Sequence, residues 1–270
     1  MEADRIFQGS IPALYDQHLG PLIFAPYAED LASRLADMPH GRILETAAGT
    51  GVVTRTLVST LPESVSIVAT DLNQAMVDHA SGQLSPPRVT WRQADAQALP
   101  FPDGEFDAVV CQFGVMFFPD RPQAFSEAYR VLKPGGRFLF NVWDRIEENE
   151  FADLVVTSVA TLFPDDPPLF LARTPHGHHD TVALEAQVRA AGFGTVATET
   201  VTRDSVAPSA LSVAVGYCQG TPMRNEIEAR GPDRLDEATD VVVAAITKRF
   251  GSGPVSGKIR AHVITAVRNS

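Results

Sequence analysis

The chain is poor in cysteine and in positive charge. Cys111 and Cys218 are far apart and lie in apolar surroundings, so their spacing predicts no metal site and favours a reducing compartment. Lys and Arg number 22 against 33 Asp and Glu, which gives a net charge of −11. Nucleic-acid phosphates attract a basic surface, so this balance argues against a nucleic-acid partner.

Long apolar runs are also missing. No stretch is long enough to span a bilayer, and residues 1–5 lack the basic and apolar regions of a signal peptide. We found no internal repeat and no low-complexity tract. We therefore expect a cytoplasmic protein without membrane insertion, whose 270 residues can bury a full core as one domain. Self-association into a homo-oligomer stays open.

The most informative stretch is a predicted strand, turn and helix over residues 43–52. Two apolar residues end a buried strand, Glu45 follows, and the helix begins at Val52 after a run of small residues. Gly49 and Gly51 allow a sharp turn and a close approach of backbone to a ligand. Such a turn places N–H groups and a helix N-terminus beside that ligand.

Two kinds of nucleotide ligand compete for this turn. In the dinucleotide fingerprint G-x-G-x-x-G, the first glycine would fall on Ala47 and the third on Val52, so two of three positions fail. An acid at Glu45 also suits a positively charged ligand better than a pyrophosphate. An ordinary strand-to-helix turn of an α/β enzyme is the plain alternative. Thr50 can cap the helix that follows.

The second predicted strand, residues 65–70, ends at Asp71, 20 residues after Gly51. An acid at this distance can reach the ribose hydroxyls of a nucleoside cofactor, and the spacing would equally suit NAD. Asn73 then begins a helix that carries Met76. The Met76 side chain could lie against a purine or pack in the core.

A third predicted strand, residues 89–93, precedes Asp95, which could bind an adenine amino group or only cap a turn. The fourth strand, 108–111, leads into the Phe/Met-rich segment 112–118. Open α/β sheets bind ligands at the carboxyl ends of their strands, so this segment should face the ligand crevice. A helix from Asp120 and a fifth strand over 137–143 follow.

Five motifs in this order resemble class I S-adenosylmethionine-dependent methyltransferases, in particular the branch of the menaquinone/ubiquinone and many small-molecule methyltransferases. The motifs are E-x-A-x-G-x-G at 45–51, Asp71-Leu72, Ala94-Asp95-Ala96, Phe106-Asp107 and Leu132-Lys-Pro-Gly-Gly136. The resemblance covers residues 40–143. It implies a doubly wound, seven-stranded, mostly parallel α/β sheet, with S-adenosylmethionine as methyl donor and S-adenosylhomocysteine as product.

The resemblance also implies a cofactor role for individual residues. Backbone at Ala47 and Gly49 would contact the methionine part, and Glu45 would lie near its ammonium group. The other implied contacts are Asp71 to ribose, Leu72 and Met76 beside adenine, Asp95 and Ala96 at its amino edge, and Gln112 and Phe113 beside the methionine part and the methyl group. Many members have glycine where this chain has Ala47, a difference that costs little if the backbone there is extended.

The rest of the chain is expected to complete and cover the sheet. Residues 1–40 read as a helical cap broken by Pro12, Pro21 and Pro26, and Tyr15 in it is a further candidate for cofactor contact. A helix over 181–191 and strands over 194–201 and 258–267 follow. The stretches 145–180 and 204–256 are surplus to the fold, and we expect them to form a lid over the substrate.

His176 and His178 are weak candidates for a catalytic base, because histidine titrates near neutral pH. Adjacent histidines in a loop do not match a common metal spacing, so we expect no metal, and loop hydrogen bonding is the plain alternative. The family resemblance and the Phe/Met-rich segment 113–118 predict a methyltransferase that acts on a small apolar or aromatic acceptor. A nicotinamide-dependent oxidoreductase and a non-catalytic S-adenosylmethionine-binding module are the alternatives.

Overall fold

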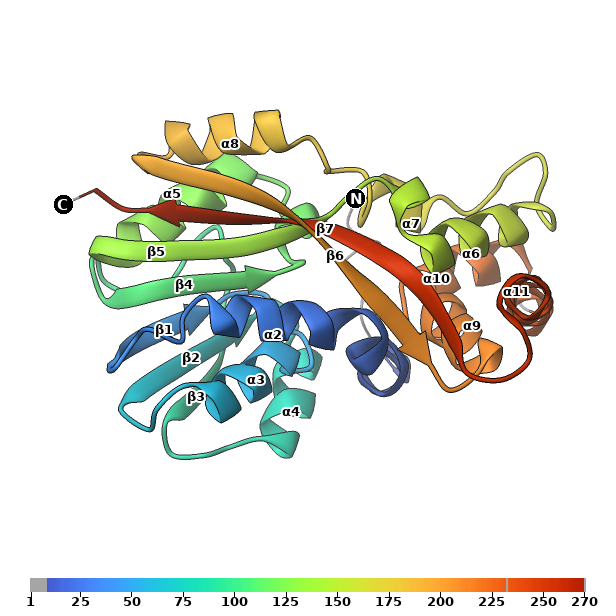
Figure 1. The fold of residues 1–270 in the computed structure, drawn as a ribbon, viewed down its shortest axis with the longest axis horizontal. Helices are drawn as coiled ribbons and strands as arrows, with labels where there is room; N and C mark the ends of the chain where they lie inside the picture. The colour runs from blue at the N-terminus through green and yellow to red at the C-terminus, as the bar shows by residue number, and fades with distance from the viewer. Residues whose placement is uncertain (1–8, 232, 270) are drawn as a thin grey trace. The chain divides into compact units, whose positions relative to one another are not determined.

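The computed structural model describes residues 9–231 and 233–269 and divides the chain into two compact units (Figure 1). We call them the core unit and the helical unit. The core unit consists of Tyr27–Val142, His179–Val201 and His262–Ser270, and the helical unit of Met1–Pro26, Trp143–His178 and Thr202–Ala261. Nearly all of the surplus stretches 145–180 and 204–256 fall within the helical unit. Their role as a lid remains a prediction.

One seven-stranded sheet has the strand order β3-β2-β1-β4-β5-β7-β6. The strands are β1 Gly41–Glu45, β2 Val65–Asp71, β3 Val89–Gln93, β4 Phe106–Gln112, β5 Leu132–Trp143, β6 Thr195–Ala207 and β7 Val255–Val267. The first five in sequence pair in parallel. Strand β7 runs antiparallel to β5, because Gly136 pairs with Arg268 while Asp144 pairs with Arg260. The expected doubly wound sheet is therefore confirmed.

The parallel register brings the carboxyl ends of four strands to one edge of the sheet. Glu45 on β1 is level with Ala69 on β2, and Asp71 is level with Gln93 on β3. On the other side, Gln112 of β4 follows the residues that pair with β1. The strand order reverses between β1 and β4, and a ligand crevice is expected outside the strand ends at such a switch point.

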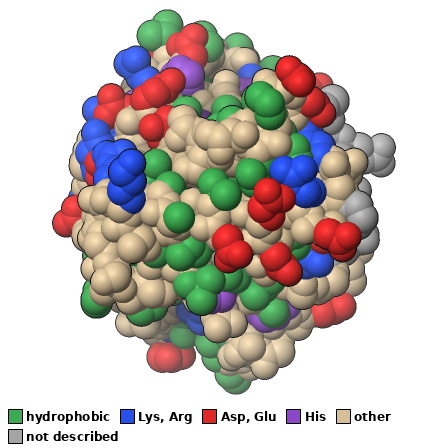
Figure 2. Space-filling view, turned by 90° about the vertical axis from the view of Figure 1, so that its right-hand side faces the viewer, with side chains coloured by type: hydrophobic (Ala, Val, Ile, Leu, Met, Phe, Trp, Pro, Cys, Tyr) green, Lys and Arg blue, Asp and Glu red, His purple; other side chains and the backbone are tan. Residues whose placement is uncertain are grey.

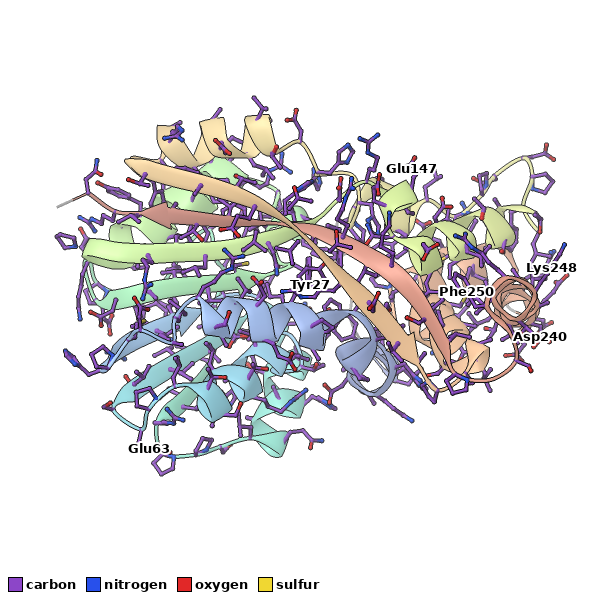
Figure 3. The ribbon with its side chains drawn as sticks, in the orientation of Figure 1. Tyr27, Glu63, Glu147, Asp240, Lys248 and Phe250 are labelled. Atoms are coloured by element: carbon purple, nitrogen blue, oxygen red, sulfur yellow. The ribbon has the colours of Figure 1, made fainter. Side chains whose placement is uncertain are left out.

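Helices cover both faces of this sheet (Figure 1). The helices of the core unit are α2 Ala25–Ser33, α3 Val52–Thr60, α4 Gln74–Gln83, α5 Arg121–Val131 and α8 Thr181–Ala190, with a 3₁₀ turn at Val115–Phe117. Phe125 on α5 stacks on Phe140 of β5, with 5.3 Å between ring centroids. This contact buries one face of the sheet against α5. On α2, Tyr27 is fully buried (Figure 3).

The helical unit contains most of the remaining helices. They are α1 Ile11–Leu14, a π-helix at Tyr15–Phe24, a 3₁₀ turn at Ile146–Glu148, α6 Glu150–Ala160, α7 Phe170–Arg173, α9 Ala210–Gln219, α10 Met223–Arg230 and α11 Arg234–Phe250. Phe250 at the end of α11 packs edge-on against Phe151 of α6 (Figure 3). Figure 2 shows a face of the molecule on which acidic, basic and apolar side chains are interspersed. None of the described helices is both long and apolar enough to cross a membrane.

The N-terminal segment differs from its sequence-based prediction. Prolines were expected to break it, yet helical structure runs without a gap from Ile11 to Ser33. Pro21 lies inside the π-helical part, where the Ala25 N–H donates to the Gly20 carbonyl five residues earlier. A π-helical turn is wider than an α-helical one, which gives the proline ring room beside the preceding turn.

Candidate functional site

The loop between β1 and α3 is held by hydrogen bonds to both neighbouring strands. The Thr46 N–H donates to the Val110 carbonyl of β4, and the Ala48 N–H donates to the Thr70 carbonyl of β2, each at 2.9 Å. Gly49 then has φ +55°, in the left-handed region. These hydrogen bonds fix the loop at the switch point of the sheet. The loop contains the glycine backbone that is predicted from the sequence to approach a ligand.

Helix α3 begins differently from our expectation. Gly51, with φ +82°, is its N-cap residue, and no side chain caps the helix. The predicted cap by Thr50 is therefore wrong, and the Thr50 hydroxyl is buried without a hydrogen-bond partner among the described residues. A Cβ on Gly51 would lie 2.8 Å from the Trp91 ring, so both conformation and space require glycine here.

Ala47 and Phe113 have unusual backbone conformations. Their φ angles are +53° and +50°, and within the described residues they are the two non-glycine residues with positive φ. The backbone at Ala47 is therefore not extended, so the condition under which alanine would cost little is not met, and the left-handed conformation costs about 1–2 kcal/mol. Both residues follow carboxyl ends of adjacent strands. Backbone strain of this kind persists only where the surrounding structure holds it in place, and strained residues are concentrated at ligand sites.

Asp71 connects the two loops at the ends of β1 and β2. Its Oδ2 accepts from the Gly49 N–H at 2.9 Å, and its Oδ1 accepts from the Asn73 N–H at 2.8 Å. Burial raises the pKa of Asp71 above its ordinary value, while these backbone hydrogen bonds oppose the shift. A carboxylate has about four acceptor positions, so Asp71 can accept from a ligand hydroxyl as well as from the protein. Because the Gly49 N–H is engaged, a ligand contact at Gly49 would use its carbonyl oxygen.

Glu45 is 1% exposed, and its Oε2 accepts a 2.6 Å hydrogen bond from the Thr54 hydroxyl of α3. Burial raises the pKa of Glu45 to about 8, and the nearby Asp71 carboxylate adds to the shift. Glu45 is therefore largely protonated at neutral pH in the ligand-free protein. A cation bound beside it would favour the charged form and lower this pKa again.

The residues implied for adenine differ in their exposure. Leu72 is 44% exposed although it is a large apolar residue. Met76 is only 3% exposed and belongs to the buried face of α4, together with Val77 and Ala80. Half-buried Asp95 accepts through Oδ1 from the Gln97 N–H at 2.9 Å, so it also forms a turn. Ala96 is half-buried beside it. Leu72 is thus available to a ligand, while Met76 has the surroundings of a core residue.

The loop after β4 contains Gln112 and Phe113, and sequence reasoning missed its partner on β5. Asn141 is fully buried, is level with Gln112 in the register, and accepts from the Phe113 N–H through Oδ1 at 2.9 Å. The sequence pattern that could have indicated Asn141 is a single amide side chain in the otherwise apolar end of β5. The Phe113 ring meets Tyr27 edge-on, with 5.3 Å between centroids.

Three further predicted site residues belong to the helical unit. Tyr15 stacks on Phe24, with centroids 4.8 Å apart. The buried His176 donates through Nδ1–H to the Asp144 carbonyl at 2.8 Å, as the loop alternative expected, and His178 is half-buried. Cofactor contact by Tyr15 and catalysis by the histidines stay predictions. Within 9–231 and 233–269, no cluster of three or more His, Cys, Asp or Glu could hold a metal ion.

Known proteins share both the sequence and the fold of this region. Residues 44–140 match a family model described as a methyltransferase domain. The ubiquinone/menaquinone biosynthesis C-methyltransferase UbiE of Geobacter sulfurreducens is 44% identical over 36% of this chain and 40% of its own length. The namesake protein of Escherichia coli is 32% identical over 57% of this chain and 66% of its own length. The chain thus spans less than two thirds of these relatives.

Among solved structures, phosphoethanolamine N-methyltransferase 2 of Haemonchus contortus in complex with S-adenosyl-L-methionine superposes with a TM-score of 0.62. The two chains are 17% identical, and the match covers 99% of this chain and 59% of the other. At this identity the likeness establishes the fold. The strand order, the glycine loop and the family match agree with each other. The chain has the fold of class I S-adenosylmethionine-dependent methyltransferases, and its residues 44–140 match the family model of a methyltransferase domain.

Proposed function

We propose that the chain transfers a methyl group from S-adenosylmethionine to a ring carbon of a small, apolar hydroquinone. The observation that carries the donor is the pair of buried carboxylates, Glu45 and Asp71, on either side of the left-handed Gly49. S-adenosylmethionine has an ammonium group, a sulfonium and a ribose diol, which suit these two acids. A pyrophosphate would instead lie beside two acidic side chains, and its negative charge would oppose the ionisation of both.

The proposed donor site uses the residues implied by the family resemblance. Asp71 would accept from the ribose hydroxyls with the lone pairs that its backbone bonds leave over. Glu45 would balance the ammonium group, and exposed Leu72 would cover one face of adenine. Asp95 accepts from the Gln97 backbone N–H and from its side-chain amide, and an adenine amino group would be a further donor to this carboxylate. The Phe113 backbone and ring would border the methyl group.

The proposed reaction is an in-line displacement at the methyl carbon. The ring carbon of the acceptor forms the new bond, the bond from methyl to sulfur breaks, and its electron pair stays on sulfur. The ring then loses the proton from the methylated carbon, which restores aromaticity. Alignment in a water-poor pocket supplies much of the acceleration, so the chemistry needs no unusual catalytic side chain.

Two observations support an apolar hydroquinone as the acceptor. The segment after β4 is apolar, with Val115 and Met116 buried and Phe113 beside Tyr27. The relatives in Geobacter sulfurreducens and Escherichia coli are named for C-methylation in ubiquinone/menaquinone biosynthesis. A carbon nucleophile must be electron-rich, and a quinone becomes electron-rich when it is reduced to the hydroquinone. We therefore favour the reduced form.

The test is an anaerobic assay with S-adenosylmethionine carrying a tritium-labelled methyl group. The acceptor probe is 1,4-dihydroxynaphthalene. The matched control is 2,3-dimethyl-1,4-dihydroxynaphthalene, in which methyl groups block the two free carbons of the hydroquinone ring. Label in the first compound and not in the second supports C-methylation. Label in both indicates O-methylation, and label in neither excludes this acceptor class.

Calorimetry with S-adenosylhomocysteine and with NADH tests the donor separately. We expect the first to bind and the second not to bind. Binding of NADH alone would support the oxidoreductase alternative. Binding of S-adenosylhomocysteine without methyl transfer to the hydroquinone, or to any compound in a metabolite extract, would support the non-catalytic module.

A further inference from the structure

Asn141 has an unambiguous orientation in the core unit. Its Oδ1 accepts from the Phe113 N–H at 2.9 Å, so a flipped amide would place its own N–H groups against another donor. The side chain is 0% exposed and lies on β5, level with Gln112 at the end of β4. One amide oxygen therefore fixes the first turn after β4.

The residue held by this bond is in a strained conformation. Phe113 has φ +50°, which residues other than glycine rarely adopt. A hydrogen bond to its N–H favours this conformation over the extended one. The same turn places the Phe113 ring edge-on against the ring of Tyr27, whose hydroxyl donates to the Val201 carbonyl at 2.9 Å. Asn141 thus sets both the backbone and the ring of Phe113.

The turn also touches the glycine loop after β1. Gly114 follows Phe113, and a Cβ built on it would lie 2.4 Å from the Ala47 methyl and 2.8 Å from the Cys111 sulfur. The two left-handed residues, Ala47 and Phe113, are therefore packed into one arrangement. A change in the turn at Phe113 would displace the loop that begins at Ala47.

The side-chain amide of Asn141 lowers the stability of the fold, so good packing alone does not account for an asparagine at this position. Its Nδ2 is buried and has no hydrogen-bond partner among the described residues. A buried donor without a partner destabilises the fold, and leucine, which is similar in size, would avoid that cost. What the asparagine contributes and leucine would lack is the bond to Phe113.

We propose that Asn141 is a positioning residue for cofactor binding, which acts by holding Phe113 in its left-handed conformation. The inference rests on the proposed function, because it takes the loops at Ala47 and Phe113 to border S-adenosylmethionine. Asn141 itself needs no contact with the ligand. Its effect reaches the cofactor through the backbone of Phe113 and through the packing of Gly114 on Ala47.

The test measures the affinity for S-adenosylhomocysteine by calorimetry. Asn141→Leu, which removes the acceptor, should lower the affinity about tenfold. Asn141→Asp keeps an oxygen for the Phe113 N–H in either protonation state, so its affinity should stay within about threefold of wild type. Rescue by aspartate separates loss of the hydrogen bond from loss of a well-packed side chain.

A double mutant tests the route through Phe113. Glycine adopts a left-handed conformation without strain, so in a Phe113→Gly background the further change Asn141→Leu should cost less than about threefold in affinity. Asn149→Leu is the matched control. Asn149 is also buried but lies in the helical unit, where its amide donates to the Arg145 carbonyl and accepts from the Arg260 N–H. The Asn149→Leu variant should have a lower thermal stability and an unchanged affinity for S-adenosylhomocysteine.

Each other outcome overturns the inference. Unchanged affinity in Asn141→Leu, equal losses in the leucine and aspartate variants, or an undiminished loss in the Phe113→Gly background would each exclude the positioning role. If the wild-type protein fails to bind S-adenosylhomocysteine at all, the proposed function itself fails. That result is distinct, because it does not depend on any variant.

Discussion

Gly114 packs so closely against Ala47 that a Cβ on Gly114 would lie 2.4 Å from the Ala47 methyl. Ala47 is strained by its left-handed backbone, with φ +53°. Replacement by glycine removes this strain of about 1–2 kcal/mol but increases the entropy of the unfolded chain. We therefore expect Ala47→Gly to raise the free energy of unfolding by up to about 1 kcal/mol, measured by denaturant titration.

The substitution Gly114→Ala is expected to have the opposite effect on stability. Gly114→Ala places a methyl group against Ala47 and the Cys111 sulfur and should lower the free energy of unfolding by about 1–3 kcal/mol. In the double mutant Ala47→Gly, Gly114→Ala, part of that loss should return, because one of the two clashing groups is gone. Strictly additive effects would show that the two residues are not coupled as the structure implies.

How far the sequence predicts this molecule depends on which interactions are local. The strand ends at Glu45 and Asp71 follow from apolar runs and their spacing, and the structure confirms both. The conformation of Ala47 could not be predicted in this way. It results from hydrogen bonds of its neighbours to β2 and β4, which lie far away in the sequence. Alanine, unlike glycine, gives no local signal of positive φ.

Asn141 and Pro21 show two other limits of prediction from the sequence. The role of Asn141 depends on its register with β4, a pairing between strands whose partners are about 30 residues apart, so its own segment says nothing of it. Pro21 was expected to end a helix, but the π-helical turn around it avoids the usual clash. Local rules predicted the elements correctly where the backbone is regular, and failed where tertiary contacts impose an irregular one.

Glu45 should make cofactor binding depend on pH. Burial raises the pKa of Glu45 to about 8 from its ordinary value of 4.5. The stability that protonated Glu45 contributes is therefore complete below pH 4.5 and is lost as pH rises through about 8. Binding of an ammonium beside Glu45 lowers this pKa, so a proton must leave when S-adenosylhomocysteine binds near neutral pH.

Calorimetry in buffers of different ionisation enthalpy measures that proton. We expect release of up to about one proton per bound ligand at pH 6–7, and an affinity that increases with pH up to about 8. Glu45→Gln should abolish both effects, since glutamine does not titrate. Equal proton release by the wild-type protein and the variant would exclude Glu45 as the ammonium partner.

Asp71 should determine affinity through two contacts. It anchors Gly49 and, in the proposed function, accepts from ribose hydroxyls. Loss of a hydrogen bond to a charged group costs about 1.5–3 kcal/mol, so Asp71→Ala should weaken S-adenosylhomocysteine binding tenfold or more. Asp78→Ala is the control, because Asp78 is exposed on α4 and its carboxylate accepts from the side-chain amide of Gln74 on the same helix. Comparable losses in the two variants would refute a specific role for Asp71.

Leu72 offers the cleanest separation of binding from stability. It is 44% exposed, so Leu72→Ala removes little buried area from the ligand-free fold, and the free energy of unfolding should change by less than about 0.5 kcal/mol. If its side chain covers adenine, the variant should bind S-adenosylhomocysteine about three- to tenfold more weakly, because apolar area is then buried only in the complex. Calorimetry measures the affinity, and denaturant titration measures the stability.

Val182 provides the matched control for this prediction. It is another large apolar residue at the surface, 78% exposed. It belongs to α8 and not to a loop that directly follows one of the parallel strands. Val182→Ala should change neither affinity nor stability measurably. A Leu72→Ala variant that binds as tightly as wild type would mean that the exposed side chain does not contact adenine. The loop after β2 would then contribute to the cofactor site through Asp71 alone.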